Sequence, residues 1–248
     1  MIVDGVDLEI ARFGSGSGTP IILLHEGLGS VGLWRDFPFA LASITGREVI
    51  AWSRRGYGQS APFDGPYGLG FMHFEADISE KVLKRLDISR AHLLGHSDGA
   101  SIALLHAVRH PARIASLIVE APHVFVEPMT IESIVAFGQS VTRSDVLSRM
   151  AKYHRDPAAV FAQWHDIWTS PRFPEWSIEA ELEAVKKPVL VIQGEDDEYG
   201  SFAQLDKIAE QIPQTKQLRL SSCGHSPHRD RRADVLDAVR TFLNEVDP

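Results

Sequence analysis

Short runs of almost entirely apolar residues alternate along the chain with longer stretches whose apolar residues recur at helical spacing. Such apolar runs are typical of strands that are covered on both faces of a parallel sheet. The predicted strands span residues 6–13, 20–25, 48–53, 91–94, 116–120, 188–194 and 216–220. The predicted helices span residues 34–44, 71–86, 100–109, 201–212 and 231–245. This alternation predicts an α/β fold with a mostly parallel twisted sheet and helices on both faces.

The first predicted strand, 6–13, alternates apolar and polar residues instead of forming an apolar run. It is followed by the flexible sequence Gly14-Ser15-Gly16-Ser17-Gly18. We expect this stretch to close a hairpin between strands 6–13 and 20–25.

The alternation of strands and helices breaks between residues 123 and 187, where the sequence is helical, aromatic and polar, without a convincing strand. We therefore predict a core formed by residues 1–122 and 188–248, with a helical cap inserted as residues 123–187. Trp164 and Trp168 lie four positions apart and share a face if that stretch is helical. That face either packs against the core or forms a wall of a substrate pocket, and the sequence leaves both interpretations open.

Composition and charge narrow the classes of partner. The hydrophobic share of 44% and the charged share of 23% are typical of a globular protein. The net charge of −8 argues against a nucleic-acid partner. Cys223 is the one cysteine, so no intramolecular disulfide is possible, which fits a reducing cytoplasm. The sequence shows no basic apolar leader and no apolar run of membrane-spanning length, so we expect a cytoplasmic protein without membrane contact. We also expect a monomer or a homodimer.

The sequence Gly95-His96-Ser97-Asp98-Gly99 lies between a predicted strand and a predicted helix. A serine between two glycines at such a turn is typical of a nucleophile elbow, in which the tight turn tolerates only small residues beside the serine. The helix that follows favours developing negative charge at its N-terminus. Ser97 is therefore the candidate nucleophile.

A serine nucleophile needs a base within hydrogen-bond reach, and the base needs an orienting carboxylate. His225 follows the last predicted strand beside Gly224, and it is the candidate base. The carboxylate is Asp197 or Asp196, which both follow strand 188–194, and we favour Asp197. Parallel sheets have their sites at the carboxyl ends of the strands, and the candidate nucleophile, base and carboxylate all follow such strand ends.

Three other histidines compete with His225. His96 lies beside the nucleophile, but its position in the turn points it away from the Ser97 hydroxyl. His228 is expected on the turn after His225, and His25 is expected to support its own loop through hydrogen bonds.

An oxyanion hole requires two backbone N–H groups aimed at the tetrahedral oxygen. One N–H belongs to the residue after the nucleophile, which is Asp98. The other comes from the glycine-rich loop after strand 20–25, where we expect Gly27 to supply it.

These motifs resemble those of the α/β-hydrolase superfamily, and within it the valacyclovir hydrolase, or biphenyl hydrolase-like, group of serine hydrolases. The resemblance covers the full length and rests on Leu94-Gly95-His96-Ser97-Asp98-Gly99, Ala51-Trp52-Ser53-Arg54-Arg55-Gly56-Tyr57-Gly58-Gln59-Ser60, Gly194-Glu195-Asp196-Asp197 and Gly224-His225. It implies an α/β-hydrolase fold, a Ser97-Asp197-His225 triad and hydrolysis of a carboxylic ester. The chain departs from many relatives at His25-Glu26-Gly27, where they have His-Gly.

The leading hypothesis is therefore a serine hydrolase that cleaves a small-molecule carboxylic ester through an acyl-enzyme intermediate. The main alternatives are a hydrolase of carbon–carbon bonds in ring-cleavage products and a non-catalytic binder of small molecules on the same fold. A serine nucleophile argues against dehalogenases and epoxide hydrolases, which resemble this fold but use aspartate. No residue cluster shows metal-ligand spacing, so we expect no metal and no organic cofactor.

Overall fold

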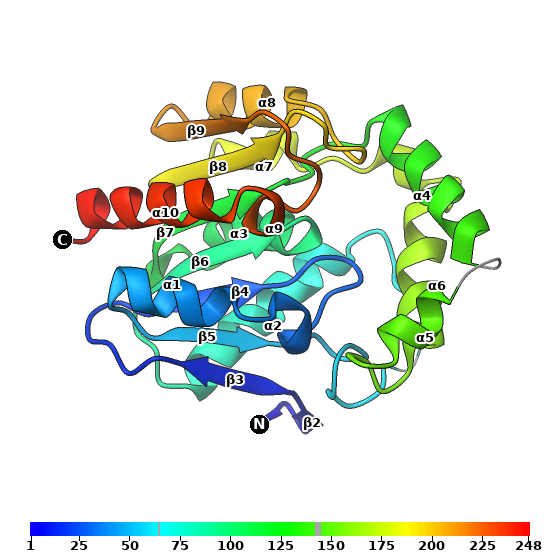
Figure 1. Cartoon of the computed structure of the whole chain (residues 1–248), viewed down its shortest axis with the longest axis horizontal. Helices are drawn as coiled ribbons and strands as arrows, with labels where there is room; N and C mark the ends of the chain where they lie inside the picture. The colour runs from blue at the N-terminus through cyan, green and yellow to red at the C-terminus, as the bar shows by residue number, and fades with distance from the viewer. Residues whose placement is uncertain (64, 142–144) are drawn as a thin grey trace.

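The computed structural model describes residues 1–63, 65–141 and 145–248, and at its centre lies a seven-stranded sheet (Figure 1). The strands are β3 (Ile10–Phe13), β4 (Ile21–Leu24), β5 (Val49–Trp52), β6 (Ala91–His96), β7 (Ile114–Glu120), β8 (Val189–Gly194) and β9 (Thr215–Leu220). Their order is β3-β5-β4-β6-β7-β8-β9, and every neighbouring pair is parallel except β3 with β5. Every residue of β4 to β8 is buried, as their apolar sequences predict.

Helices cover both faces of the sheet (Figure 1). The larger ones are α1 (Phe37–Thr45) and α10 (Arg232–Val246) on one face, and α2 (Phe71–Arg85), α3 (Asp98–Arg109) and α8 (Ala203–Gln211) on the other. Each face has its own apolar cluster: Leu41 and Phe242 pack in the first, and Leu83 and Leu104 pack in the second. The predicted parallel sheet between two helical layers is confirmed.

The predicted hairpin at the start of the chain is wrong. β3 pairs antiparallel with β5, from Ile10 opposite Trp52 to Phe13 opposite Val49, and β4 lies on the other side of β5. The glycine-rich linker packs closely against the residues that lead into β5. A Cβ on Gly16 would lie only 1.9 Å from the carbonyl oxygen of Gly46. The linker therefore carries the chain past β5 instead of folding it back.

Two of the predicted elements each consist of two separate elements in the structure. The strand predicted over 6–13 consists of β2 (Val6–Asp7) and β3, because β2 pairs with β1 (Ile2–Val3) in a separate two-stranded sheet. The helix predicted over 34–44 consists of the short 3₁₀ helix η1 (Val31–Trp34) and α1. Arg35 separates them with a φ of 54°, a left-handed conformation that ends a helix.

The chain between β7 and β8 forms α4 (Pro128–Val141), α5 (Val146–Met150), α6 (Pro157–Trp168), the 3₁₀ helix η3 (Phe173–Glu175) and α7 (Glu179–Leu182). Helices α4 to α6 stand beyond the carboxyl ends of the strands, at the right of Figure 1. Helix α7 instead contacts α3 and α8 in the layer on the sheet. Residues 142–144 of the predicted cap lie outside the described residues, and the cap boundaries at 123 and 187 stay a prediction.

Candidate active site

Ser97 lies on the tight turn between β6 and α3, with φ 54° and ψ −120°. A Cβ on Gly95 would lie 2.2 Å from the carbonyl oxygen of Gly99, and a Cβ on Gly99 would lie 2.0 Å from that of Leu24. Only glycine therefore fits at either position. The strained turn holds the Ser97 hydroxyl above the end of the sheet, at the first turn of α3.

His225, in the loop after β9, joins Ser97 to Asp197. Its Nε2 lies 2.9 Å from Ser97 Oγ, and its Nδ1 lies 2.9 and 3.0 Å from the two carboxylate oxygens of Asp197. A neutral imidazole that donates from Nδ1 to a carboxylate presents Nε2 as an acceptor to the serine hydroxyl. The fold thus brings the three predicted residues into one hydrogen-bonded chain.

The two candidate carboxylates differ in burial. Asp197 is 5% exposed, whereas Asp196 lies at the surface. The Asp197 carboxylate also accepts hydrogen bonds from the Tyr199 backbone N–H at 2.8 Å and from Gln193 Nε2 at 3.2 Å. Burial acts to raise the pKa of Asp197, but the facing charge and hydrogen bond of His225 outweigh it, so the pKa lies below its usual value. Asp197 is therefore an anion at neutral pH.

The backbone N–H groups of Gly27 and Asp98 belong to the loop after β4 and to the first turn of α3, which lie in close contact. A Cβ on Gly27 would lie 3.3 Å from the Asp98 carboxylate and 2.3 Å from the Trp164 ring. Neither N–H donates a hydrogen bond to another residue that the structure describes. The Asp98 N–H is one of the helix N-terminal donors that have no partner within the helix.

The three competing histidines form hydrogen bonds with other residues. His96 Nε2 is 2.6 Å from the backbone carbonyl oxygen of His225, and His25 Nδ1 is 2.8 Å from that of Glu26. His228 lies on α9 (Pro227–Asp230), with Nδ1 2.8 Å from the Glu120 carboxylate. Across the described chain, none of these three rings hydrogen-bonds to Ser97.

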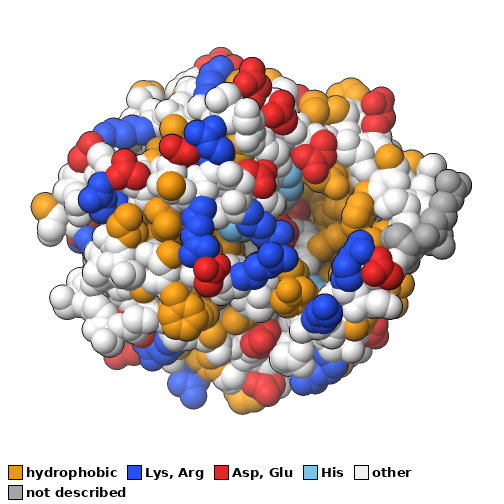
Figure 2. All heavy atoms as spheres, viewed as in Figure 1, with side chains coloured by type: hydrophobic (Ala, Val, Ile, Leu, Met, Phe, Trp, Pro, Cys, Tyr) orange, Lys and Arg blue, Asp and Glu red, His pale blue; other side chains and the backbone are white. Residues whose placement is uncertain are grey.

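A pocket of about 160 Å³ opens at Ser97 between the strand ends and helices α4 and α6. Its lining residues are Glu26, Gly27, Leu28, Ser97, His123, Thr130, Ile134, Phe137, Trp164, Trp168, Tyr199 and His225. Figure 2 shows hydrophobic side chains gathered in the hollow between the sheet and these helices. Trp164 and Trp168 therefore both line the pocket, on successive turns of α6.

A model of the alpha/beta hydrolase family matches residues 21–238 of the chain. The chain belongs to this family. The chain is 31% identical over 250 residues to the serine hydrolase BPHL of Mus musculus, covering 97% of this chain and 84% of the relative. It is 27% identical over 259 residues to the 2-hydroxymuconate semialdehyde hydrolase of Pseudomonas sp. (strain CF600), covering 94% of this chain and 89% of the relative.

Among solved structures, the chain matches Est816, described as an N-acyl homoserine lactone degrading enzyme, with a TM-score of 0.75 and 25% identity. The match covers 96% of this chain and 98% of that one. The predicted α/β-hydrolase fold and family are confirmed, and the chain is an enzyme of the hydrolase class.

The pocket of this hydrolase contains residues that the sequence did not single out. His123 and Tyr199 follow the ends of β7 and β8, where the strand-end rule could have found them. His123 is 2% exposed, and burial and the charge of His225 lower its pKa to about 3, so it is neutral. Thr130, Ile134 and Phe137 come from α4, and no sequence pattern indicates which face of that helix meets the pocket.

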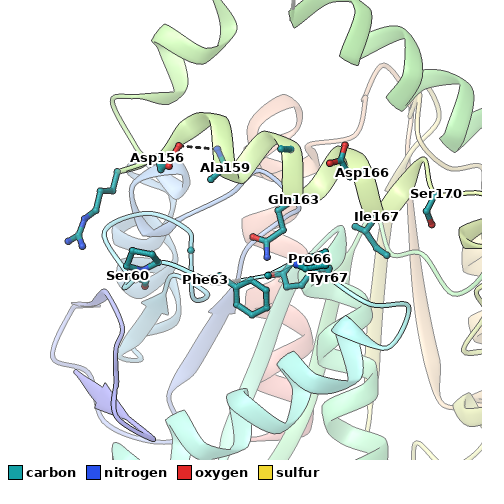
Figure 3. Close-up of a pocket in the computed structure, with 15 residues that line it drawn as sticks. Ser60, Phe63, Pro66, Tyr67, Asp156, Ala159, Gln163, Asp166, Ile167 and Ser170 are labelled. Atoms are coloured by element: carbon teal, nitrogen blue, oxygen red, sulfur yellow. Dashed lines mark hydrogen bonds between the residues drawn. The ribbon is translucent and has the colours of Figure 1, made fainter.

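A second and larger cavity, of about 550 Å³, lies on the other side of α6 (Figure 3). Residues 56–63 and 65–67 form one wall, and Gln163 and Ile167 reach into the cavity from α6. Its described lining includes neither Ser97 nor His225, so this cavity is separate from the pocket of the hydrolase.

None of the described helices is long and apolar enough to cross a membrane. Within the same part of the chain, no three His, Cys, Asp or Glu side chains come together in a way that could hold a metal ion. The absence of a metal or organic cofactor stays a prediction.

Proposed function

We propose that this chain is a serine hydrolase that cleaves a small carboxylic ester through an acyl-enzyme intermediate. The observation that carries the proposal is the continuous hydrogen-bonded chain from Ser97 Oγ through His225 to the buried anion of Asp197. In this proposal Ser97 is the nucleophile, His225 is the general base and acid, and Asp197 orients the imidazole.

In the first half-reaction, Ser97 Oγ attacks the ester carbonyl carbon while His225 Nε2 takes the hydroxyl proton. The N–H groups of Gly27 and Asp98 donate to the tetrahedral oxyanion. When the intermediate collapses, the bond to the alkoxy oxygen breaks, and that oxygen takes the proton from His225. The alcohol leaves, and the acyl group stays on Ser97.

In the second half-reaction, a water molecule gives a proton to His225 and attacks the acyl carbon. The same N–H groups stabilise the second oxyanion. The bond to Ser97 Oγ then breaks, Oγ recovers its proton from His225, and the carboxylic acid leaves.

The pocket supports a compact substrate. Its volume of about 160 Å³ is below the roughly 300–1,000 Å³ of typical ligand pockets. Apolar and aromatic side chains from α4 and α6 form much of its wall, which favours a short aliphatic or aryl group over a long charged one.

A second candidate is hydrolysis of a carbon–carbon bond in a ring-cleavage product. It is supported by the 27% identity to 2-hydroxymuconate semialdehyde hydrolase across 94% of this chain. The third hypothesis, a non-catalytic binder, does not fit a member of a hydrolase family. Binding alone also does not require a serine aligned with a histidine and a buried carboxylate.

Activity against p-nitrophenyl acetate, butyrate and octanoate, an amino-acid ester and a ring-cleavage dienoate tests the proposal. We expect the acetate and butyrate to be hydrolysed with a higher kcat/KM than the octanoate, because of the small pocket. Cleavage of the dienoate without hydrolysis of any ester would establish the second candidate instead. Binding of these compounds without turnover would contradict both candidates.

Replacing Trp164 or Trp168 with alanine should change the ratio of kcat/KM between the butyrate and octanoate esters. Each substitution removes an aromatic wall, so the longer ester should gain relative to the shorter one by up to about 1–3 kcal/mol. The thermal unfolding midpoint of each variant controls for lost packing. A lower midpoint with an unchanged ratio for both variants would show that the pair only packs the cap against the core.

We further infer that the protein works in the cytoplasm on a small-molecule substrate, as a monomer or a homodimer. The single cysteine, Cys223, is buried and unpaired, which fits a reducing compartment.

A further inference from the structure

Arg54 is a buried cation close to the catalytic pocket. It lies in the loop after β5, and it is only 3% exposed. Its guanidinium group contacts two segments, the loop after β4 and the first turn of α3. These are the same two segments from which the proposed oxyanion donors come.

The first contact fixes the peptide group between Glu26 and Gly27. Arg54 Nη2 donates to the Glu26 carbonyl oxygen at 2.9 Å. The Arg54 backbone N–H donates to His25 Nε2 at 3.0 Å, so the neutral His25 ring has its proton on Nδ1 and donates to the same oxygen at 2.8 Å. A trans peptide is planar, with its C=O and N–H pointing in opposite directions. Donors that hold the Glu26 oxygen therefore also set the direction of the Gly27 N–H.

The second contact concerns the charge of Asp98. Arg54 Nη1 and Nη2 lie 3.4 and 3.5 Å from Asp98 Oδ2, and the Asp98 side chain is 1% exposed. A buried carboxylate one residue after Ser97 opposes the negative charge that develops on a tetrahedral intermediate. The Arg54 guanidinium faces this carboxylate and offsets its field.

We propose that Arg54 is the positioning residue of the oxyanion hole, where it orients the Gly27 N–H and neutralises the Asp98 carboxylate. This inference rests on the proposed function. Arg54 does not line the pocket, so it acts through the loop after β4 and the first turn of α3, and not by contact with the substrate.

The neighbouring Arg55 provides a matched control. Its Nε donates to the Pro62 carbonyl oxygen at 2.7 Å, and its guanidinium lies 5.6 Å from the centre of the Phe63 ring. Those residues belong to the loop on the far side of α6 from Ser97. Arg55→Met therefore removes a similar cation from the adjacent position and breaks its contacts with Pro62 and Phe63, which lie outside the two segments that Arg54 joins.

The test compares Arg54→Met, Arg54→Lys and the double variant Arg54→Met/Asp98→Asn with Arg55→Met and the wild type. The readouts are kcat and KM for p-nitrophenyl acetate, and the inhibition constant of trifluoroacetone. This ketone forms a tetrahedral adduct with a serine, and the adduct carries its oxyanion in the hole. A group that acts only in the transition state changes kcat and the affinity for such an adduct together.

We expect Arg54→Met to lower kcat by about 10²–10³-fold and to raise the inhibition constant of trifluoroacetone by a similar factor. KM should stay within about threefold of the wild type. Arg54→Lys should keep the charge but lose one of the two contacts, so its kcat should be intermediate. Asp98→Asn should recover about tenfold when added to Arg54→Met, because it removes the uncompensated carboxylate.

Several outcomes would overturn the inference. An Arg54→Met variant that keeps the wild-type kcat and ketone affinity would do so. So would a double variant no more active than Arg54→Met, or an Arg55→Met variant with the same loss. If Arg54→Met does not fold, the kcat and ketone affinity of Arg54→Lys decide the matter in the same way. A folded wild type that neither hydrolyses the ester nor binds the ketone contradicts the proposed function itself.

Discussion

Ser97→Ala is expected to lower kcat for p-nitrophenyl acetate by on the order of 10⁶-fold. No other serine in the described chain is hydrogen-bonded to His225, and the alanine has no oxygen to attack the carbonyl carbon. The fold should survive, because the substitution removes one hydroxyl and leaves both glycines of the turn in position. Steady-state hydrolysis and the thermal unfolding midpoint together check this result.

Ser226→Ala is the matched control for Ser97→Ala. Ser226 is next to His225, at the start of α9, so its substitution removes a hydroxyl from the same region without touching the proposed nucleophile. We expect its kcat to stay within about threefold of the wild type. If Ser97→Ala retains a substantial part of the activity, the nucleophile is another group.

Asp197→Asn is expected to lower kcat by about 10⁴-fold. The asparagine nearly preserves the shape of the side chain but replaces a carboxylate oxygen with a donor. His225 then accepts at Nδ1 and carries its proton on Nε2, so it cannot take the proton from Ser97. KM should change little, because Asp197 does not line the pocket.

Asp196→Asn makes the same chemical change one residue earlier and tests the choice between the two carboxylates. Asp196 is exposed, whereas Asp197 is bonded to His225. We expect Asp196→Asn to keep kcat within about threefold of the wild type. The reverse order of the two effects would assign the orienting role to Asp196.

The sequence predicts the sheet and the neighbourhood of the site for a common physical reason. Apolar runs identify the buried strands, and the carboxyl ends of parallel strands meet at one edge of a sheet. Ser97, Asp197 and His225 follow β6, β8 and β9, so their convergence follows from the strand pattern alone.

The remaining features depend on packing that the sequence pattern does not describe. The flexible linker over residues 14–18 favours a hairpin between β3 and β4, but β3 instead pairs with β5. Local propensity carries no information about such a non-sequential pairing. Arg54 and Arg55 are identical neighbours in a polar loop, and only the fold distinguishes the buried one from the one that contacts Phe63.

The most direct test of the account is to map the adduct formed with a fluorophosphonate probe by mass spectrometry of the digested protein. A serine activated as in the proposed triad attacks the phosphorus and becomes covalently labelled. We expect one adduct, on the peptide that contains Ser97, and no adduct in Ser97→Ala. Labelling at another residue, or labelling that persists in Ser97→Ala, would contradict the role of Ser97 as the nucleophile.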